Sequence, residues 1–261
     1  MENKTAVITG ATSGIGAAYA DRFAKEGYDL IITGRRKEKI EVFAEKIRKD
    51  CSVSVEVVLA ELSSDEGVQE LIERINGRQI ETLVNNAGFG ASSLYQNCDL
   101  EVMEQMAKVS VLAPMKLIRA VLPGMVDRRR GTIINVSSGS AFLIFPKKSV
   151  YSGVKAFLKS FTEGLHLDLM NTGVKVQVVC PGSTLTDFHG KMGIDISTKQ
   201  NKAPLLWFTP EYVVDVSLRD LKKNKVICIP GVHSKILIRL LNLLPINLYY
   251  RTIYIFSNKK L

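Results

Sequence analysis

The sequence predicts an α/β fold, a doubly wound parallel sheet with helices on both faces. Short apolar, β-rich runs alternate with amphipathic segments of helical length along most of the chain, and this alternation is typical of repeated βαβ units. A glycine-rich turn joins the first strand to the first helix. Hydrophobic residues make up 46% of the 261, enough for a large core. We therefore expect residues 1–261 to form a single three-layer α/β/α domain.

The elements follow one another in a regular order. Strands are expected at residues 5–9, 29–33, 53–59 and 82–85, and helices at 15–25, 37–49 and 65–76. The second half continues with helices over about 100–128, a strand at 132–136, a long helix near 150–170 and a strand at 174–179. Thr209 and Pro210 start a helix that runs to about 223, because proline is favoured in a first helical turn. A last strand is expected at 226–230.

Two segments depart from this alternation. Residues 183–209 contain a polar, glycine-containing stretch, which predicts a substrate loop or lid. Residues 232–261 form an amphipathic C-terminal extension, and no Asp or Glu occurs between 221 and 261. Its apolar face is expected to be buried against another surface. The chain's own core, a subunit interface in a homodimer or homotetramer, and the headgroup layer of an anionic membrane remain alternatives.

Composition excludes several classes of protein. The four cysteines are widely separated and lie near no histidine cluster, so neither a metal site nor a disulfide framework is indicated. The N-terminus lacks the features of a signal peptide, and no apolar run reaches the roughly 18 residues of a membrane span. The formal charge is +9, but no nucleic-acid recognition motif accompanies it. We expect a cytoplasmic protein, with membrane association through the extension as an alternative.

The turn after the first strand predicts a dinucleotide site. Gly10 allows a tight turn, Gly14 lets the backbone approach a pyrophosphate, and Gly16 permits close helix packing. The N-terminus of the following helix offers N–H groups and a positive dipole to an anion. The same turn supplies the further cofactor contacts Thr12, Ser13 and Ile15.

The end of the second strand indicates which dinucleotide binds. An acidic side chain at this place accepts hydrogen bonds from the adenosine ribose. This chain reads Thr33-Gly34-Arg35-Arg36 instead, which removes a carboxylate and offers two guanidinium groups for a 2′-phosphate. The sequence therefore favours NADP(H) over NAD(H).

Tyr151 and Lys155 are the candidate acid–base pair. They are four residues apart in a predicted helix, so their side chains share one face. An ammonium beside a phenol lowers the tyrosine pKa, which suits general acid–base chemistry. Such a pair is common by chance. However, Ser137 and Ser138 end a predicted strand, and ligands of open α/β folds bind at the carboxyl ends of the strands.

Five motifs in this order resemble the short-chain dehydrogenase/reductase family as far as about Thr186. They are Thr9-Gly10-x-x-x-Gly14-Ile15-Gly16, Asn85-Asn86-Ala87-Gly88, Ser138, Tyr151-x-x-x-Lys155 and Pro181-Gly182-x-x-x-Thr186. The resemblance implies a Rossmann-like fold and an NADP-dependent enzyme acting on CH–OH groups. It also implies that Ser138 binds the substrate oxygen and Tyr151 is the acid–base. Lys155 would bind the nicotinamide ribose and lower the Tyr151 pKa.

The resemblance extends to the other cofactor contacts. Asn86, Ala87 and Gly88 resemble the segment that stabilises the sheet and lines the adenosine side. Glu61 stands where the family more often has Asp beside the adenine. The expected contacts near the nicotinamide are Pro181, Gly182, Thr184 and Thr186.

Ser110 departs from the family pattern, which usually has an asparagine here to hold a water in the proton relay. A hydroxyl cannot reproduce the donor and acceptor geometry of an amide. We keep Ser110 among the catalytic residues and still expect an enzyme. The alternative is a nucleotide-binding regulator or scaffold with little turnover.

The substrate is expected to be a hydrophobic ketone or alcohol, such as a steroid, bile acid, fatty-acyl or other lipid-like molecule. Apolar residues flank the motifs and offer a pocket for it. They are Phe89, Phe142, Leu143, Phe145, Phe188, Met192, Leu205, Leu206, Trp207 and Phe208.

Overall fold

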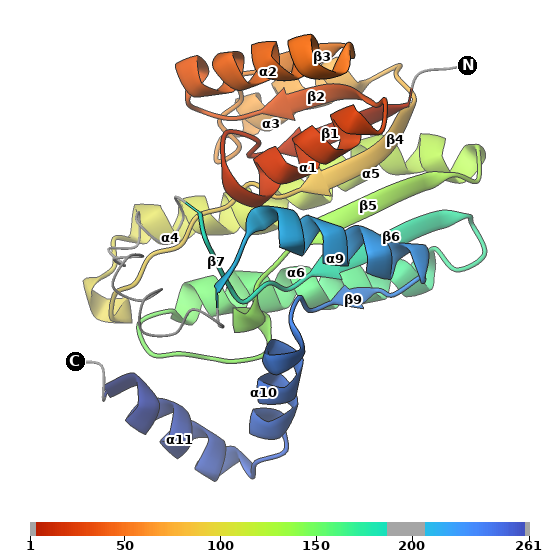
Figure 1. Cartoon of the computed structure of the whole chain (residues 1–261). Coiled ribbons are helices and arrows are strands. Elements are labelled where there is room, and N and C mark those ends of the chain that lie inside the picture. The colour runs from red at the N-terminus through yellow and green to blue at the C-terminus, as the bar shows by residue number, and fades with distance from the viewer. Residues whose placement is uncertain (1–3, 187–206, 259–261) are drawn as a thin grey trace.

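A seven-stranded parallel sheet forms the centre of the molecule (Figure 1). The computed structural model describes residues 4–186 and 207–258. The strand order is β3-β2-β1-β4-β5-β6-β9, so the chain builds outward in both directions from the β1–β4 pair. The strands are β1 (Thr5–Thr9), β2 (Asp29–Thr33), β3 (Val55–Val58), β4 (Ile80–Asn85), β5 (Gly131–Val136), β6 (Val174–Val179) and β9 (Ile227–Cys228). This arrangement confirms the predicted doubly wound, Rossmann-like fold.

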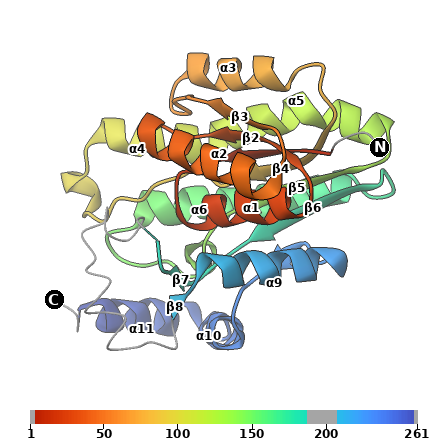
Figure 2. The same ribbon diagram turned by 45° about the horizontal axis from the view of Figure 1, so that its top comes forward.

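Helices cover both faces of the sheet (Figure 2). One face carries α1 (Gly14–Lys25), α2 (Lys37–Cys51) and α9 (Pro210–Lys222). The other carries α3 (Asp65–Ile75), α5 (Ala113–Asp127) and α6 (Ser149–Asp168), with α4 (Leu100–Ala107) leading into α5. Three layers result, as the alternation of strand and helix predicts.

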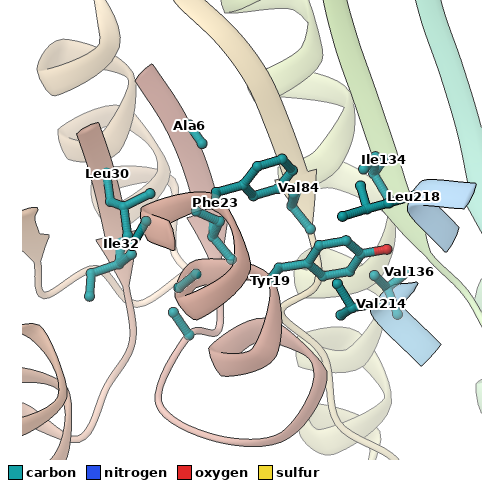
Figure 3. Packing of buried hydrophobic residues seen from close by; sticks show 14 of the residues in the cluster. Ala6, Tyr19, Phe23, Leu30, Ile32, Val84, Ile134, Val136, Val214 and Leu218 are labelled. Carbon is teal, nitrogen blue, oxygen red and sulfur yellow. The ribbon is translucent and has the colours of Figure 1, made fainter. Parts of the chain in front are cut away.

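Alternate residues of each strand divide between two cores, because successive side chains of a strand point to opposite faces. In β1, Ala6 and Ile8 join the core under α1, α2 and α9, whereas Val7 joins the core under α3, α5 and α6. Figure 3 shows Tyr19 and Phe23 of α1 packing over the first of these faces. The Tyr19 hydroxyl donates to Ser217 of α9 at 2.5 Å, which ties these two helices together.

The helices predicted over about 100–128 are joined by an irregular turn. A π-helical turn, η2 (Lys108–Leu112), separates α4 from α5 and contains Ser110. Among the described helices, the combined run Leu100–Asp127 is long and apolar enough to cross a membrane by length and composition. Ala113 and Leu117 of this run are buried against the sheet, and 44% of its most apolar window is buried inside the fold.

Short elements that the sequence did not predict lie around the sheet. They are the two-residue strands β7 (Ser183–Thr184) and β8 (Trp207–Phe208), and the 3-10 turns η1 (Tyr95–Asn97) and η3 (Gly139–Ala141). Strands β7 and β8 pair with each other across a long stretch of sequence, and local patterns do not reveal such pairing. The predicted strand 226–230 is shorter, because only Ile227 and Cys228 pair with β6.

The C-terminal extension contains two helices, α10 (Val232–Asn242) and α11 (Ile246–Asn258), on either side of Pro245. One side of each packs on the chain itself, where Ile238, Tyr249 and Ile253 bury against Leu143. Self-packing therefore covers part of the apolar surface, and other apolar side chains of both helices remain exposed.

Candidate active site

The candidate site is a cleft of about 270 Å³ at the carboxyl ends of the central strands. It lies where the winding direction reverses between β1 and β4, the usual ligand position in open α/β sheets. Two residues expected in the site, Gly16 and Ser110, stand outside its lining. The expected residues that line it are Gly10, Thr12, Ser13, Gly14, Ile15, Arg35, Arg36, Glu61, Asn86, Ala87, Gly88, Ser138, Tyr151, Lys155, Pro181, Gly182, Thr184 and Thr186.

The glycine-rich turn brings backbone close to the cleft. Gly10 and Gly14 have φ angles of +68° and +60°, a region that favours glycine. We term the turn at residues 10–16 the glycine cradle. A Cβ on Gly14 would lie 2.7 Å from the methyl of Thr186, so a larger residue at position 14 would clash with Thr186. The Ser13 side chain does not cap α1, and the first turn of α1 contains no acidic residue. The cradle therefore suits the pyrophosphate of a dinucleotide.

Asn86 fastens this turn to the end of β4. Its side-chain amide donates to the carbonyls of Thr9 and Gly10 at 3.0 and 3.1 Å. The Thr9 hydroxyl accepts from the backbone N–H groups of Asn86 and Ala87, both at 2.9 Å. Thr9 belongs to the predicted motif, but the sequence alone assigns it no role. The position of a hydroxyl at the end of a strand was the one feature that could have indicated this role. We term these Asn86 hydrogen bonds the Asn86 latch. Gly16 packs directly against it, since a Cβ on Gly16 would meet the Asn86 amide and the Gly10 carbonyl.

The two arginines at the end of β2 have different partners. Arg36 donates to the hydroxyls of Thr12 and Ser13, both at 2.9 Å. Arg35 forms an ion pair with Glu61 at 3.2 Å. Burial opposes ionisation of Glu61, but hydrogen bonds from Ser63 and the Arg35 charge outweigh it and lower its pKa. This end of the cleft is thus basic, although Glu61 offsets part of the charge of Arg35.

Tyr151, Lys155 and Ser138 come together at the opposite end of the cleft. Tyr151 and Lys155 are buried in the first turns of α6, and Ser138 follows β5. The Lys155 ammonium donates to the Val136 carbonyl at 3.0 Å and lies 5.9 Å from the centre of the Tyr151 ring. The Ser137 hydroxyl donates to the Lys155 carbonyl at 2.8 Å. Ser137 therefore ties α6 to the end of β5, a positioning contact that sequence reasoning missed.

Burial determines the acid–base properties of this pair. It raises the pKa of Tyr151 to about 12, and the hydrogen bond to Ser138 opposes that rise. Burial lowers the pKa of Lys155 to about 8. The net pKa of Tyr151 is therefore raised and not lowered as expected, because removal from water disfavours the phenolate and outweighs the effects that favour it.

Ser110 lies behind the wall of the cleft. Its hydroxyl is buried and has no hydrogen-bond partner among the described residues. A Cβ on Gly88 would lie 3.6 Å from the Ser110 hydroxyl and 3.4 Å from the Lys155 ammonium, so both polar groups approach Gly88. A π-helical turn often marks a functional position, and the tertiary packing of η2 places Ser110 here.

The predicted apolar substrate residues separate into different environments. Phe89 lines the cleft. Phe142, Leu143 and Phe145 instead pack against α10 and α11, because the loop after Ser138 lies under the extension. Phe208 stacks between Tyr212 and His233, with centroid distances of 5.1 and 5.0 Å. Trp207 precedes it in β8, whereas Phe188, Met192, Leu205 and Leu206 lie outside the described residues.

The described part of the chain contains no group of three or more side chains suited to a metal ion. Its chemistry-bearing residues are instead the glycine cradle, the two arginines and the Ser138, Tyr151 and Lys155 group. All three features line one cleft at the carboxyl ends of the strands. The two arginines lie at one end of the cleft, and Ser138, Tyr151 and Lys155 lie at the other.

Comparisons with known proteins agree with this geometry. The family model described as short chain dehydrogenase matches residues 4–196. The chain is 37% identical over 224 residues to 17-beta-hydroxysteroid dehydrogenase type 3 of Danio rerio, covering 84% of this chain and 70% of that protein. A solved short-chain dehydrogenase from Sphingobium yanoikuyae in complex with NADPH is 32% identical, with a TM-score of 0.82 and coverage of 88% and 89%. A solved 7beta-hydroxysteroid dehydrogenase is 27% identical, with a TM-score of 0.89 and coverage of 96% of each chain. The chain belongs to the short-chain dehydrogenase family.

Proposed function

We propose that the protein is an NADP(H)-dependent oxidoreductase that interconverts a carbonyl and a secondary alcohol on a hydrophobic substrate. The observation that carries the proposal is the convergence of Ser138, Tyr151 and Lys155 in the cleft that also holds the glycine cradle. Binding and proton-transfer groups in one cleft are what a dehydrogenase requires.

The residues of the cleft fit a phosphorylated dinucleotide. The cradle at Gly10 and Gly14 and the N-terminus of α1 would hold the pyrophosphate, and Arg35 and Arg36 would pair with a 2′-phosphate. The solved relative from Sphingobium yanoikuyae is in complex with NADPH, which supports the same preference here. When bound, NADPH supplies the hydride that adds to the substrate carbonyl carbon, and NADP⁺ accepts it in the reverse direction.

The chain itself supplies the proton and holds the substrate oxygen. Ser138 donates a hydrogen bond to that oxygen, and Tyr151 transfers its phenolic proton to it as the alcohol forms. Because burial keeps the pKa of Tyr151 near 12, the phenol is protonated at neutral pH and ready to act as the acid. Lys155 binds the nicotinamide ribose and stabilises the phenolate that remains. Ser110, close to Gly88 and Lys155, joins the path that returns a proton to Tyr151.

The substrate is proposed to be a steroid, bile acid, fatty-acyl or other lipid-like molecule. Phe89 gives the cleft an apolar side chain near the reacting end. Relatives named as 17-beta- and 7beta-hydroxysteroid dehydrogenases support a hydrophobic substrate. We further propose that the protein is a cytoplasmic homodimer or homotetramer.

A panel of hydrophobic ketones, followed by loss of NADPH absorbance, tests this function. The wild type is expected to reduce at least one ketone with NADPH. Tyr151→Phe, which keeps the ring but removes the acid, should lower kcat by about 10²- to 10⁴-fold while NADPH binding is retained. Tight NADPH binding with no turnover on any ketone would favour a nucleotide-binding regulator instead.

A further inference from the structure

We propose that the exposed side of α10 and α11 docks on an anionic lipid surface. The two helices lie together outside the three layers of the fold in both views (Figures 1 and 2). Six apolar side chains, each more than half exposed, define what we term the C-terminal face. They are Ile236, Leu240, Leu243, Ile246, Tyr250 and Tyr254.

The spacing of these side chains makes two continuous stripes. Ile236, Leu240 and Leu243 follow one side of α10 and its end, and Ile246, Tyr250 and Tyr254 follow one side of α11. Residues three or four apart share a helix surface. The other side of each helix is already buried against the loop at Leu143. The stripes are therefore additional to the surface that anchors the helices on the protein.

Charge identifies the partner. Arg239 and Arg251 are exposed on the same two helices, and residues 221–261 contain eight Lys or Arg and no Asp or Glu. In a two-fold dimer formed through this face, the same surface would meet itself, so cations would face cations without acidic partners. Anionic headgroups instead attract such a surface, while tyrosine rings suit the boundary between headgroups and acyl chains. The composition thus favours lipid over a second copy.

The C-terminal face is connected to the candidate active site. The hydroxyl of Tyr249 accepts from the Ile144 N–H at 2.8 Å, and Ile144 lies on the loop that follows Ser138. His233 at the start of α10 stacks on Phe208 of β8, the strand that pairs with Ser183 and Thr184 beside the cleft. Docking would hold this side of the cleft near the lipid. This step rests on the proposed function: a hydrophobic substrate would then reach the cleft from the membrane.

Co-sedimentation of the full chain with vesicles tests the proposal. Phosphatidylglycerol-containing vesicles should bind the wild type at low salt, at least tenfold more strongly than pure phosphatidylcholine vesicles. High salt should weaken the binding. Two variants address the two components of the surface, Ile236→Ser/Leu240→Ser/Tyr250→Ser for the apolar stripes and Arg239→Gln/Arg251→Gln for the charge. Each is expected to lower vesicle affinity by about tenfold or more.

Matched controls carry the same changes elsewhere on the surface. Val42, Leu100 and Leu167 are more than half exposed on α2, α4 and α6, so Val42→Ser/Leu100→Ser/Leu167→Ser should leave vesicle binding unchanged. Lys46→Gln/Lys49→Gln, at exposed positions of α2, is the charge control. Circular dichroism checks that every variant is folded.

Three results would overturn the proposal. The wild type does not pellet with anionic vesicles, the controls lose as much binding as the face variants, or the face variants alter sedimentation velocity and leave vesicle binding intact. The last result would identify a subunit interface. Because vesicle binding needs no substrate, its failure is distinguishable from a failure of the proposed oxidoreductase activity.

Discussion

At the scale of single residues, Glu61 reduces the positive charge at the end of the cleft that Arg35 and Arg36 line. Its ionised carboxylate pairs with Arg35 at 3.2 Å, and both side chains are close to half exposed. The pair is therefore screened by water. Even so, the carboxylate competes with any phosphate that Arg35 would bind.

Glu61→Gln should release Arg35 and raise affinity for NADPH by up to about fivefold, the range expected of an exposed charge pair. Affinity for NADH, which lacks the 2′-phosphate, should change less. Titration calorimetry with both nucleotides measures the difference. Glu56→Gln, which breaks ion pairs with Arg74 and Arg78 outside the cleft, is the control. Weaker NADPH binding by Glu61→Gln would contradict the proposed competition.

Ser110 is the second residue whose chemistry can be tested directly. Its buried hydroxyl lacks a partner among the described residues and lies near the Lys155 ammonium across Gly88. Ser110→Asn introduces an amide that can donate and accept, and we expect equal or higher kcat with KM for NADPH unchanged. Steady-state kinetics over a range of pH provide the measurement. A large loss of kcat in a folded variant would mean that the serine has a role of its own.

At the scale of elements, the contact between α1 and the end of β4 positions the glycine cradle. Gly16 leaves room for the Asn86 amide, which in turn holds the Thr9 and Gly10 carbonyls. This contact joins the first βα unit to the end of β4, because Thr9 and Asn86 are 77 residues apart in the chain. A change at Gly16 therefore acts on both stability and cofactor binding.

Gly16→Ala should destabilise the protein by about 1–3 kcal/mol, because the added methyl overpacks the latch, and should weaken NADPH binding. Gly164→Ala is a matched control inside α6, where an added Cβ meets nothing within 4 Å. There alanine should stabilise by roughly 0.5–1 kcal/mol, since glycine is a poor helix former. Urea unfolding measures both. Equal effects of the two substitutions would show that Asn86 does not depend on close packing at Gly16.

At the scale of the whole molecule, buried ionisable groups make folding stability depend on pH. Lys155 has a pKa of about 8, below its ordinary 10.5. Between these values the unfolded chain binds more protons than the folded chain, so the Lys155 contribution makes the fold more stable as pH rises. Tyr151 acts oppositely between its ordinary 10.0 and about 12, where the folded chain retains the proton.

Comparison of the wild type with Lys155→Met isolates the first of these effects, because the other titrating groups are common to both proteins. From about pH 8 to 10, the free energy of unfolding of the wild type should rise relative to the variant by about 1–3 kcal/mol. Urea unfolding at several pH values provides the test. Parallel pH profiles would mean that Lys155 titrates normally in the fold.

Local sequence patterns predicted the doubly wound fold and most of the residues that line the cleft. Period and length of the apolar runs placed the central strands and helices within a few residues, since these patterns are local. Local motifs likewise identified the glycine cradle and the residues at the carboxyl ends of the strands. The order of the motifs predicted the family to which the chain belongs.

The interactions among these residues depend on the three-dimensional packing of the chain. Burial reversed the expected pKa shift of Tyr151, because desolvation depends on what packs around the phenol. The Asn86 latch and the Arg35–Glu61 pair both join parts of the chain that are distant in sequence. The same holds for α10 and α11, whose amphipathic pattern predicts a covered face, whereas the fold determines which residues the protein itself covers.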